Sequence, residues 1–142
     1  MSASASFVKS LLAQCCLGGI CEWVVCPGAR NMALLQVLAA AEDLVKWTHF
    51  DERSAAFFAL GRIQDMGLPV AVVTTSGTAA AELLPAVVEA YYQRRPLLLL
   101  TADRPADYRG SAAPQAIEQA DLFGIYAPTI DLEIGRASCR ER

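Results

Sequence analysis

Short apolar runs alternate with longer stretches of helical character along most of the chain. The runs expected to form strands are 20–26, 46–50, 70–75 and 96–102, with a last strand near 126–130. The expected helices are 1–17, 32–43, 54–66 and 77–94, with a short one around 117–123, and Pro85 should bend or break the fourth. Apolar strands separated by helices predict a doubly wound α/β domain, with a mostly parallel sheet covered by helices on both faces.

The chain is long enough for one domain with a single core, expected over residues 1–132. Hydrophobic residues make up 54% of it and charged residues 19%, which indicates a globular protein. The stretch 133–142 is charged, has no apolar period and resembles a translated sequencing adapter, so it is interpreted as a non-native or a disordered tail. The polar stretch 103–115 is expected to be a long loop, of a kind that is often functional or mobile.

Charge and composition argue against several classes of partner. A net charge of −3 gives no basic surface for a nucleic acid or an anionic membrane. No apolar run is long enough to span a bilayer, and the first helix lacks a cationic leader, which predicts a cytoplasmic location. The five cysteines show no zinc-type spacing and His49 is the one histidine, so no metal site is expected in this chain. The cysteines are interpreted as small buried apolar residues.

Candidate chemistry gathers where the predicted strands end. Four polar groups directly follow strands: Pro27-Gly28-Ala29-Arg30, Asp51-Glu52-Arg53, Thr75-Ser76-Gly77-Thr78 and Asp103-Arg104-Pro105. Ligands of open parallel sheets bind beyond the carboxyl ends of the strands. The four groups are therefore expected to share one edge of the sheet and to form a site there.

Each group also has a purely structural interpretation. Glu52 is either a first-turn helix residue beside a capping aspartate, or a carboxyl group among apolar neighbours whose pKa is raised by desolvation so that a proton stays available. The 75–78 junction is either a capped tight turn or a place where a ligand approaches the backbone, and it matches no phosphate-binding fingerprint. Arg30 and Arg104 either pair with nearby carboxylates or bind a carboxylate ligand, and Gln115 is a further polar candidate.

Five segments, taken together in their order and spacing, resemble the N-terminal domain of the MenD family, the thiamine-diphosphate-dependent synthases of menaquinone biosynthesis. The segments are CPGAR (26–30), HFDER (49–53), TTSGTA (74–79), LLTADRP (99–105) and PQAI (114–117), and the resemblance extends to about residue 130. It implies the fold of a pyrimidine-binding domain. It also implies a reaction in which 2-oxoglutarate loses carbon dioxide and is joined to isochorismate.

The resemblance further implies roles for single residues. Glu52 matches the catalytic glutamate that hydrogen-bonds the aminopyrimidine ring of the cofactor. The implied cofactor-binding residues are Glu52, Pro27, Gly28, Thr75, Ser76, Gly77 and Thr78. The implied substrate-binding residues are Arg30, Arg104 and Gln115. Ala29 and Pro114 stand where some family members have serine and asparagine, which puts substrate contacts at these two positions in doubt.

The family holds the cofactor diphosphate and Mg²⁺ (or Mn²⁺) in a C-terminal domain with a GDG-type motif, and this sequence has no such motif. The complete enzyme is expected to be a homodimer or homotetramer in which a second subunit completes each site. This chain alone is therefore expected to be inactive and to expose an apolar partner face. Two alternatives remain open: another thiamine-diphosphate carboligase or decarboxylase of the acetolactate synthase type, or a non-catalytic α/β binding module.

Overall fold

The computed structural model describes residues 3–108 and 110–132, and they contain a four-stranded sheet of order β2-β1-β3-β4. The strands are β1 (Glu22–Val25), β2 (Val45–Thr48), β3 (Val70–Thr74) and β4 (Leu97–Thr101). All three neighbouring pairs are parallel. The central strands β1 and β3 are buried throughout, whereas β2 is exposed and β4 is half-buried at the two edges. The predicted doubly wound parallel sheet is confirmed.

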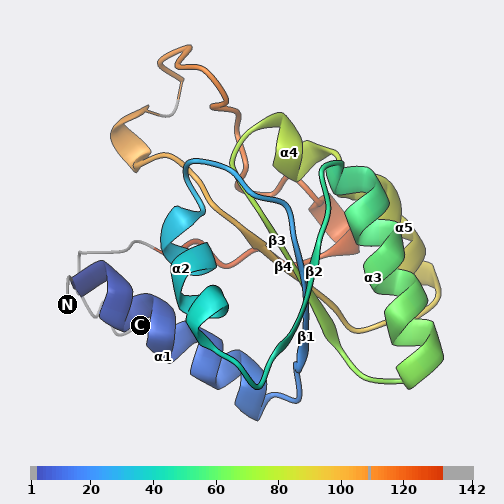
Figure 1. The fold of residues 1–142 in the computed structure, drawn as a ribbon. Coiled ribbons are helices and arrows are strands. Elements are labelled where there is room, and N and C mark those ends of the chain that lie inside the picture. The colour runs from blue at the N-terminus through green and yellow to red at the C-terminus, as the bar shows by residue number, and fades with distance from the viewer. Residues whose placement is uncertain (1–2, 109, 133–142) are drawn as a thin grey trace, which may run out of the picture.

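Helices cover both faces of the sheet (Figure 1). One face carries α1 (Ala3–Leu17) and α2 (Met32–Ala40), and the other carries α3 (Glu52–Met66) and α5 (Leu84–Tyr92). The short helix α4 (Thr78–Ala81) follows β3, and the 3₁₀ turns η1 (Ala106–Tyr108) and η2 (Gly124–Tyr126) lie in the last part of the described chain.

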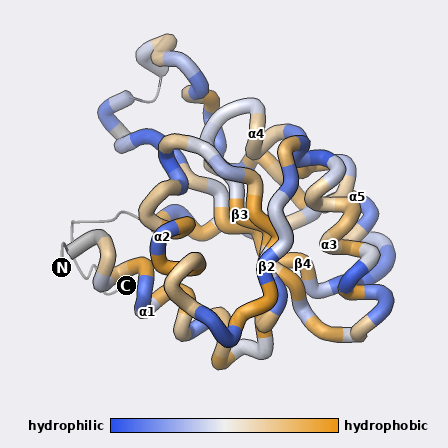
Figure 2. The backbone as a smooth tube through the Cα atoms, viewed as in Figure 1, coloured by the Kyte–Doolittle hydropathy of each residue, from blue (hydrophilic) through white to orange (hydrophobic). Residues whose placement is uncertain are grey.

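Alternate residues of the central strands feed two separate cores, because successive side chains of a strand point to opposite faces. Trp23 and Val73 pack with Val8 of α1 and Leu38 of α2. The residues that face the other way pack against α3 and α5: they are Val24, Val70 and Val72. The apolar strands occupy the centre of the molecule and polar residues lie outside them (Figure 2).

A partly buried ion pair joins α3 to the amino end of β1. Glu22 is buried, and its carboxylate accepts hydrogen bonds from Arg62 Nε at 2.9 Å and Nη2 at 2.8 Å. Trp47 of β2 donates its indole N–H to the same carboxylate at 3.0 Å, and the Arg62 guanidinium lies 5.7 Å from the centre of that ring. The carboxylate therefore joins two strands and one helix through charge-assisted hydrogen bonds.

The predicted long helix over 77–94 is divided into α4 and α5, as Pro85 suggested. Pro85 lies in the first turn of α5, where the missing N–H leaves no helix hydrogen bond unmade. Gly67 ends α3 in the left-handed conformation with φ 71°, as expected for a glycine after a helix.

Two predicted elements near the end of the chain are wrong. Residues 117–119 have no regular structure and residues 120–123 form turns rather than a helix, because Asp121 adopts a left-handed φ of 60° that interrupts α-helical geometry. Residues 126–130 pair with no strand; Pro128 lacks an amide donor for a sheet ladder, and the segment ends in exposed residues. The predicted tail, 133–142, lies outside the described residues. Within the described ranges, no helix is both long and apolar enough to cross a membrane.

Candidate functional site

The carboxyl ends of β1 and β3 meet at the topological switch point, where the chain leaves the two central strands toward opposite faces. Gly28 follows β1 and lies against Thr75, which follows β3. A Cβ atom built on Gly28 would stand 2.5 Å from Thr75 Cβ, closer than real carbon atoms approach. Thr75 Oγ1 is buried there and has no hydrogen-bond partner among the described residues. A glycine is therefore required for these two turns to lie side by side.

The turn after β1 is held by Asn31, which is 1% exposed. Its Oδ1 accepts from the Gly28 N–H and its Nδ2 donates to the Cys26 carbonyl, both at 2.9 Å. Sequence reasoning missed this residue, although a short amide just beyond Pro27-Gly28 is a recognisable turn signal. The turn is thus closed by a side chain of its own segment.

The turn after β3 is held from the segment around residue 115. Ser76 Oγ donates to the Gln115 carbonyl at 2.8 Å. Gly77 has a φ of 79°, and a Cβ there would meet Gln115 backbone atoms at 2.8–2.9 Å, so the position requires glycine on both counts. Gln115 has a left-handed φ of 54°, which a glutamine rarely adopts and which is typical of functional loops.

The two candidate substrate arginines converge on one neutral group. Arg30 donates to the Pro114 carbonyl at 3.2 Å and to Gln115 Oε1 at 3.0 Å. Arg104 donates to the same Pro114 carbonyl from Nε at 3.1 Å and from Nη2 at 2.7 Å. Neither guanidinium forms a salt bridge with a carboxylate in the described part of the chain. The alternative of surface ion pairs for Arg30 and Arg104 is therefore wrong, and two cations share a single carbonyl oxygen.

Glu52 is the first residue of α3 and is half-buried. The helix is capped by Asp51, whose Oδ1 accepts from the Ser54 N–H at 2.7 Å, so the capping interpretation is confirmed. The Glu52 carboxylate accepts no hydrogen bond from residues 3–108 or 110–132, which leaves it available to a ligand. Burial, with added repulsion from Glu52 and then Asp51, raises the pKa of the Cys26 thiol to about 12. Glu52 thus lies close enough to the end of β1 to influence a buried thiol there.

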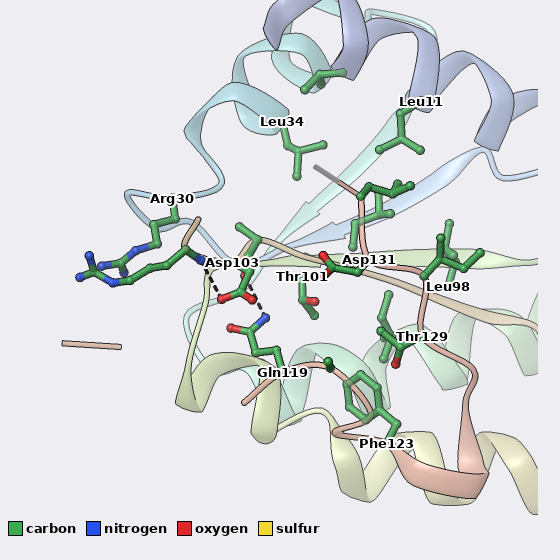
Figure 3. Close-up of a pocket in the computed structure, with 18 of the residues that line it drawn as sticks. Leu11, Arg30, Leu34, Leu98, Thr101, Asp103, Gln119, Phe123, Thr129 and Asp131 are labelled. Carbon is green, nitrogen blue, oxygen red and sulfur yellow. Dashed lines mark hydrogen bonds between the residues drawn. The ribbon is translucent and has the colours of Figure 1, made fainter. Parts of the chain in front are cut away.

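A cavity of about 720 Å³ opens beside the arginines along β4. Its apolar walls come from α1, α2 and β4, with Leu11, Leu34 and Leu98 facing inward, and its other wall is the segment that contains Thr129 and Asp131 (Figure 3). The polar end is formed by Arg30, Asp103, Arg104 and Gln119.

The structure brings the predicted site residues together in part. Gly28 meets Thr75, Ser76 and Gly77 meet Gln115, and Arg30 meets Gln115, all at the carboxyl end of the sheet. Thr78 and Pro27 are exposed beside these contacts, and Glu52 contacts neither arginine by a hydrogen bond.

Two further observations concern residues that the sequence did not place in the site. Gln119, which sequence reasoning missed, links the ends of β3 and β4, and its position in a stretch expected to be a short helix gave no signal of this. The expectation that the cysteines are buried is wrong for Cys21, which is exposed. Of the four cysteines that the structure describes, Cys26 is buried, and Cys15 and Cys16 are half-buried. No group of three or more metal-ligating His, Cys, Asp or Glu side chains forms within the described ranges.

Comparisons with known proteins agree with this architecture. The family model of the thiamine pyrophosphate enzyme N-terminal TPP binding domain matches residues 7–122. A solved structure, the Rhodococcus jostii RHA1 thiamine diphosphate-dependent 4-hydroxybenzoylformate decarboxylase, superposes with a TM-score of 0.72 over 89% of this chain and 23% of its own. Sequence identity to it is 15%, so this likeness concerns the fold alone.

Curated relatives are similar over most of the chain and share one name, 2-succinyl-5-enolpyruvyl-6-hydroxy-3-cyclohexene-1-carboxylate synthase. The relative from Akkermansia muciniphila is 96% identical over 94% of this chain and 25% of its own length. The relative from Bdellovibrio bacteriovorus is 54% identical over 76% of this chain and 20% of its own length. The resemblance predicted from the five segments is confirmed, and the chain spans a fifth to a quarter of the length of these relatives.

Proposed function

We propose that this chain, which belongs to the thiamine pyrophosphate enzyme family through its N-terminal TPP binding domain, is the pyrimidine-binding part of a synthase. The proposed reaction joins 2-oxoglutarate, with loss of carbon dioxide, to isochorismate in menaquinone biosynthesis, which makes the complete protein a carbon–carbon bond-forming transferase. The shared name of the curated relatives supports this choice over a carboligase of the acetolactate synthase type.

The residues at the switch point fit one end of the cofactor. Gly28 lets the turn after β1 lie against Thr75, whose buried Oγ1 has no hydrogen-bond partner in the described chain. Glu52 likewise offers a carboxyl group without a hydrogen-bond partner among the described residues. We assign Pro27, Gly28 and the turn 75–78 to the wall around the cofactor's pyrimidine, and Glu52 to a hydrogen bond with that ring. Thiamine diphosphate, when bound, supplies the electron sink that decarboxylation of a 2-oxo acid requires. The Glu52 carboxyl would hold or release a proton at the ring.

The observation that carries the proposal is the convergence of Arg30 and Arg104 on the Pro114 carbonyl. Two guanidinium groups that share one neutral oxygen are electrostatically incomplete, and a planar carboxylate is the ligand whose geometry matches their paired donors. Both proposed substrates carry carboxylates. Gln115, already hydrogen-bonded to Arg30, would add a side-chain contact to the same ligand.

The remainder of the site is proposed to come from outside this chain. A C-terminal domain would hold the diphosphate and Mg²⁺ or Mn²⁺, and a second subunit of a cytoplasmic homodimer or homotetramer would complete each site. The exposed aromatic side chains near Glu52 support a partner at this edge, because Phe50 is 97% exposed and Phe57 is 43% exposed. The chain alone is expected to be inactive.

A full-length chimera tests the proposal, in which the 133 aligned residues of this chain replace the matching residues of the Akkermansia muciniphila relative. Glu52→Gln should lower turnover by about 10²–10⁴-fold, since it removes a proton-transferring group. It should also slow exchange of the cofactor's thiazolium proton with solvent deuterium, followed by proton NMR. Arg30→Ala should raise the KM for 2-oxoglutarate and leave that proton exchange unchanged.

Glu42→Gln is the matched control for Glu52→Gln, because the Glu42 side chain is exposed and makes no hydrogen bond within the described residues. It should leave turnover unchanged. Normal proton exchange in the Glu52→Gln chimera would exclude the proposed role of Glu52. A parent chimera that consumes pyruvate but not 2-oxoglutarate would point to a carboligase of the acetolactate synthase type.

A further inference from the structure

Gln119 is a buried side chain that joins the ends of two adjacent strands. It is 8% exposed. Its Oε1 accepts from the Gly77 N–H at 2.7 Å, and its Nε2 donates to the Ala102 carbonyl at 3.1 Å. Ala102 directly follows β4, and its own N–H donates to the Thr74 carbonyl at 3.0 Å, so it extends the ladder with β3. One carboxamide therefore bridges the turn after β3 and the segment after β4. Figure 3 shows the Gln119 side chain among those that line the cavity.

The bridge needs a donor and an acceptor on the same short planar group. The Gly77 N–H requires an acceptor, and the Ala102 carbonyl requires a donor. A neutral amide supplies both, an ionised carboxylate supplies the acceptor alone, and a thioether supplies neither in useful strength. The chemistry of the two backbone groups thus selects glutamine at position 119.

We infer that Gln119 is a positioning residue, which fixes the turn 75–78 relative to the segment that carries Arg104. Gly77 belongs to the turn assigned to the cofactor, and Ala102 lies two residues before Arg104. The bridge consequently sets the separation between the cofactor wall and one of the substrate arginines. The catalytic consequence rests on the proposed function, whereas the bridge itself rests on the two hydrogen bonds.

Three variants of the full-length chimera separate this role from simple packing. Gln119→Glu keeps the shape and, when protonated, keeps both a donor and an acceptor; when ionised it presents a negative oxygen to the Ala102 carbonyl. Gln119→Met keeps the volume and loses both hydrogen bonds. Gln64→Glu is the control, because Gln64 is exposed on α3 and has no hydrogen bond in the described chain.

The first readout is hydrogen exchange of the Gly77 and Ala102 amides, resolved by electron-transfer fragmentation in a mass spectrometer. Relative to the parent at the same pH, the Ala102 amide of Gln119→Glu, whose own carbonyl faces the new charge, should keep its protection at about pH 5 and lose about tenfold at about pH 8, as the buried carboxyl ionises. The Gly77 amide of the same variant should stay protected at both pH values, because the carboxyl offers it an acceptor in either protonation state. Gln119→Met should lose protection of the Gly77 amide at both pH values, and Gln64→Glu at neither. The charged groups that line the same cavity are common to parent and variant, so their effect cancels in the ratio: they are Arg30, Asp103, Arg104, Asp107 and Asp131.

The second readout is the turnover of Gln119→Glu relative to the parent, which should fall by about tenfold over the same pH interval. Unchanged Gly77 protection in Gln119→Met, or a pH-independent ratio of Ala102 protection or of turnover in Gln119→Glu, would overturn the inference. Loss of the far-UV circular dichroism signal in Gln119→Glu at about pH 5 would also overturn it, because the protonated variant retains both hydrogen bonds. An inactive parent chimera would contradict the proposed function and leave the exchange measurement to decide the role of Gln119.

Discussion

Substitution of Gly28 by alanine tests the close contact at the switch point. The new Cβ would lie 2.5 Å from Thr75 Cβ and 2.9 Å from both Thr75 Cγ2 and Oγ1. Carbon atoms pack at about 3.5–4.0 Å, so the two turns must separate by roughly 1 Å or more. Rotation of the Thr75 side chain gives no relief, because the nearest atom is its Cβ. The Gly28 backbone is itself held by Asn31, so it cannot move without losing a hydrogen bond.

The expected cost follows from the size of this overlap. Overpacking of a buried contact destabilises by about 1–3 kcal/mol, and the involvement of two backbone-fixed atoms places Gly28→Ala near the upper end. A loss of about 2–3 kcal/mol lowers the thermal midpoint of a chain of this size by roughly 5–10 °C. Urea unfolding of the 142-residue chain, followed by circular dichroism, measures the free energy directly.

Gly61→Ala is the matched control for Gly28→Ala. Gly61 lies within α3, and a Cβ there meets nothing within 4 Å, so alanine should stabilise the chain by about 0.5–1 kcal/mol through helix propensity. Thr75→Gly removes the atom that clashes and should restore part of the loss in a double variant with Gly28→Ala. A Gly28→Ala chain as stable as the parent, or a double variant whose losses simply add, would refute the steric explanation.

Two further predictions concern ionisable groups. The Arg62 hydrogen bonds, and to a smaller extent that of Trp47, lower the pKa of Glu22 below its ordinary 4.5, so the pair contributes stability above that value and loses it as the pH falls through the folded-state pKa. Urea unfolding between about pH 3 and about pH 7 should therefore show a steeper acid loss in the parent than in Glu22→Gln, and equal slopes would contradict the assignment. Cys26, with its thiol pKa raised to about 12 by burial, should resist iodoacetamide at about pH 8 while exposed Cys21 is alkylated, as peptide mass spectrometry can determine. Equal labelling of the two thiols in the folded chain would show that the end of β1 is open to solvent.

The part of the fold that sequence predicts well is the part whose local signals and tertiary contacts agree. The runs that became β1 and β3 are buried on both faces, so continuous apolar character alone identifies them. The helix α3 carries a cap, an acidic first turn and a glycine stop, all of which the structure uses. Where these signals coincide, the expected elements match the observed ones to within a few residues.

Prediction failed where tertiary contacts decide the conformation. The stretch 117–123 has helical composition. The Gln119 side chain, however, forms hydrogen bonds with backbone groups that follow β3 and β4, and the chain around it is not helical. The candidate site was found as a set of strand ends, because parallel topology alone brings them to one edge. The convergence of Arg30 and Arg104 on Pro114 and the bridge through Gln119 depend on contacts between distant segments, which no local pattern encodes.

The ion pair between Glu22 and Arg62 fixes α3 at one point, which is the pivot of any tilt of the helix. Arg62 lies ten residues after Glu52, a distance of about 15 Å along a helix. A tilt of only about 4° about that pivot would carry the carboxyl group at the helix start through roughly 1 Å, a displacement that can cost an active site about a hundredfold in rate. Under the proposed role of Glu52, residues at the opposite end of the sheet would thus determine how accurately its carboxyl group meets the cofactor.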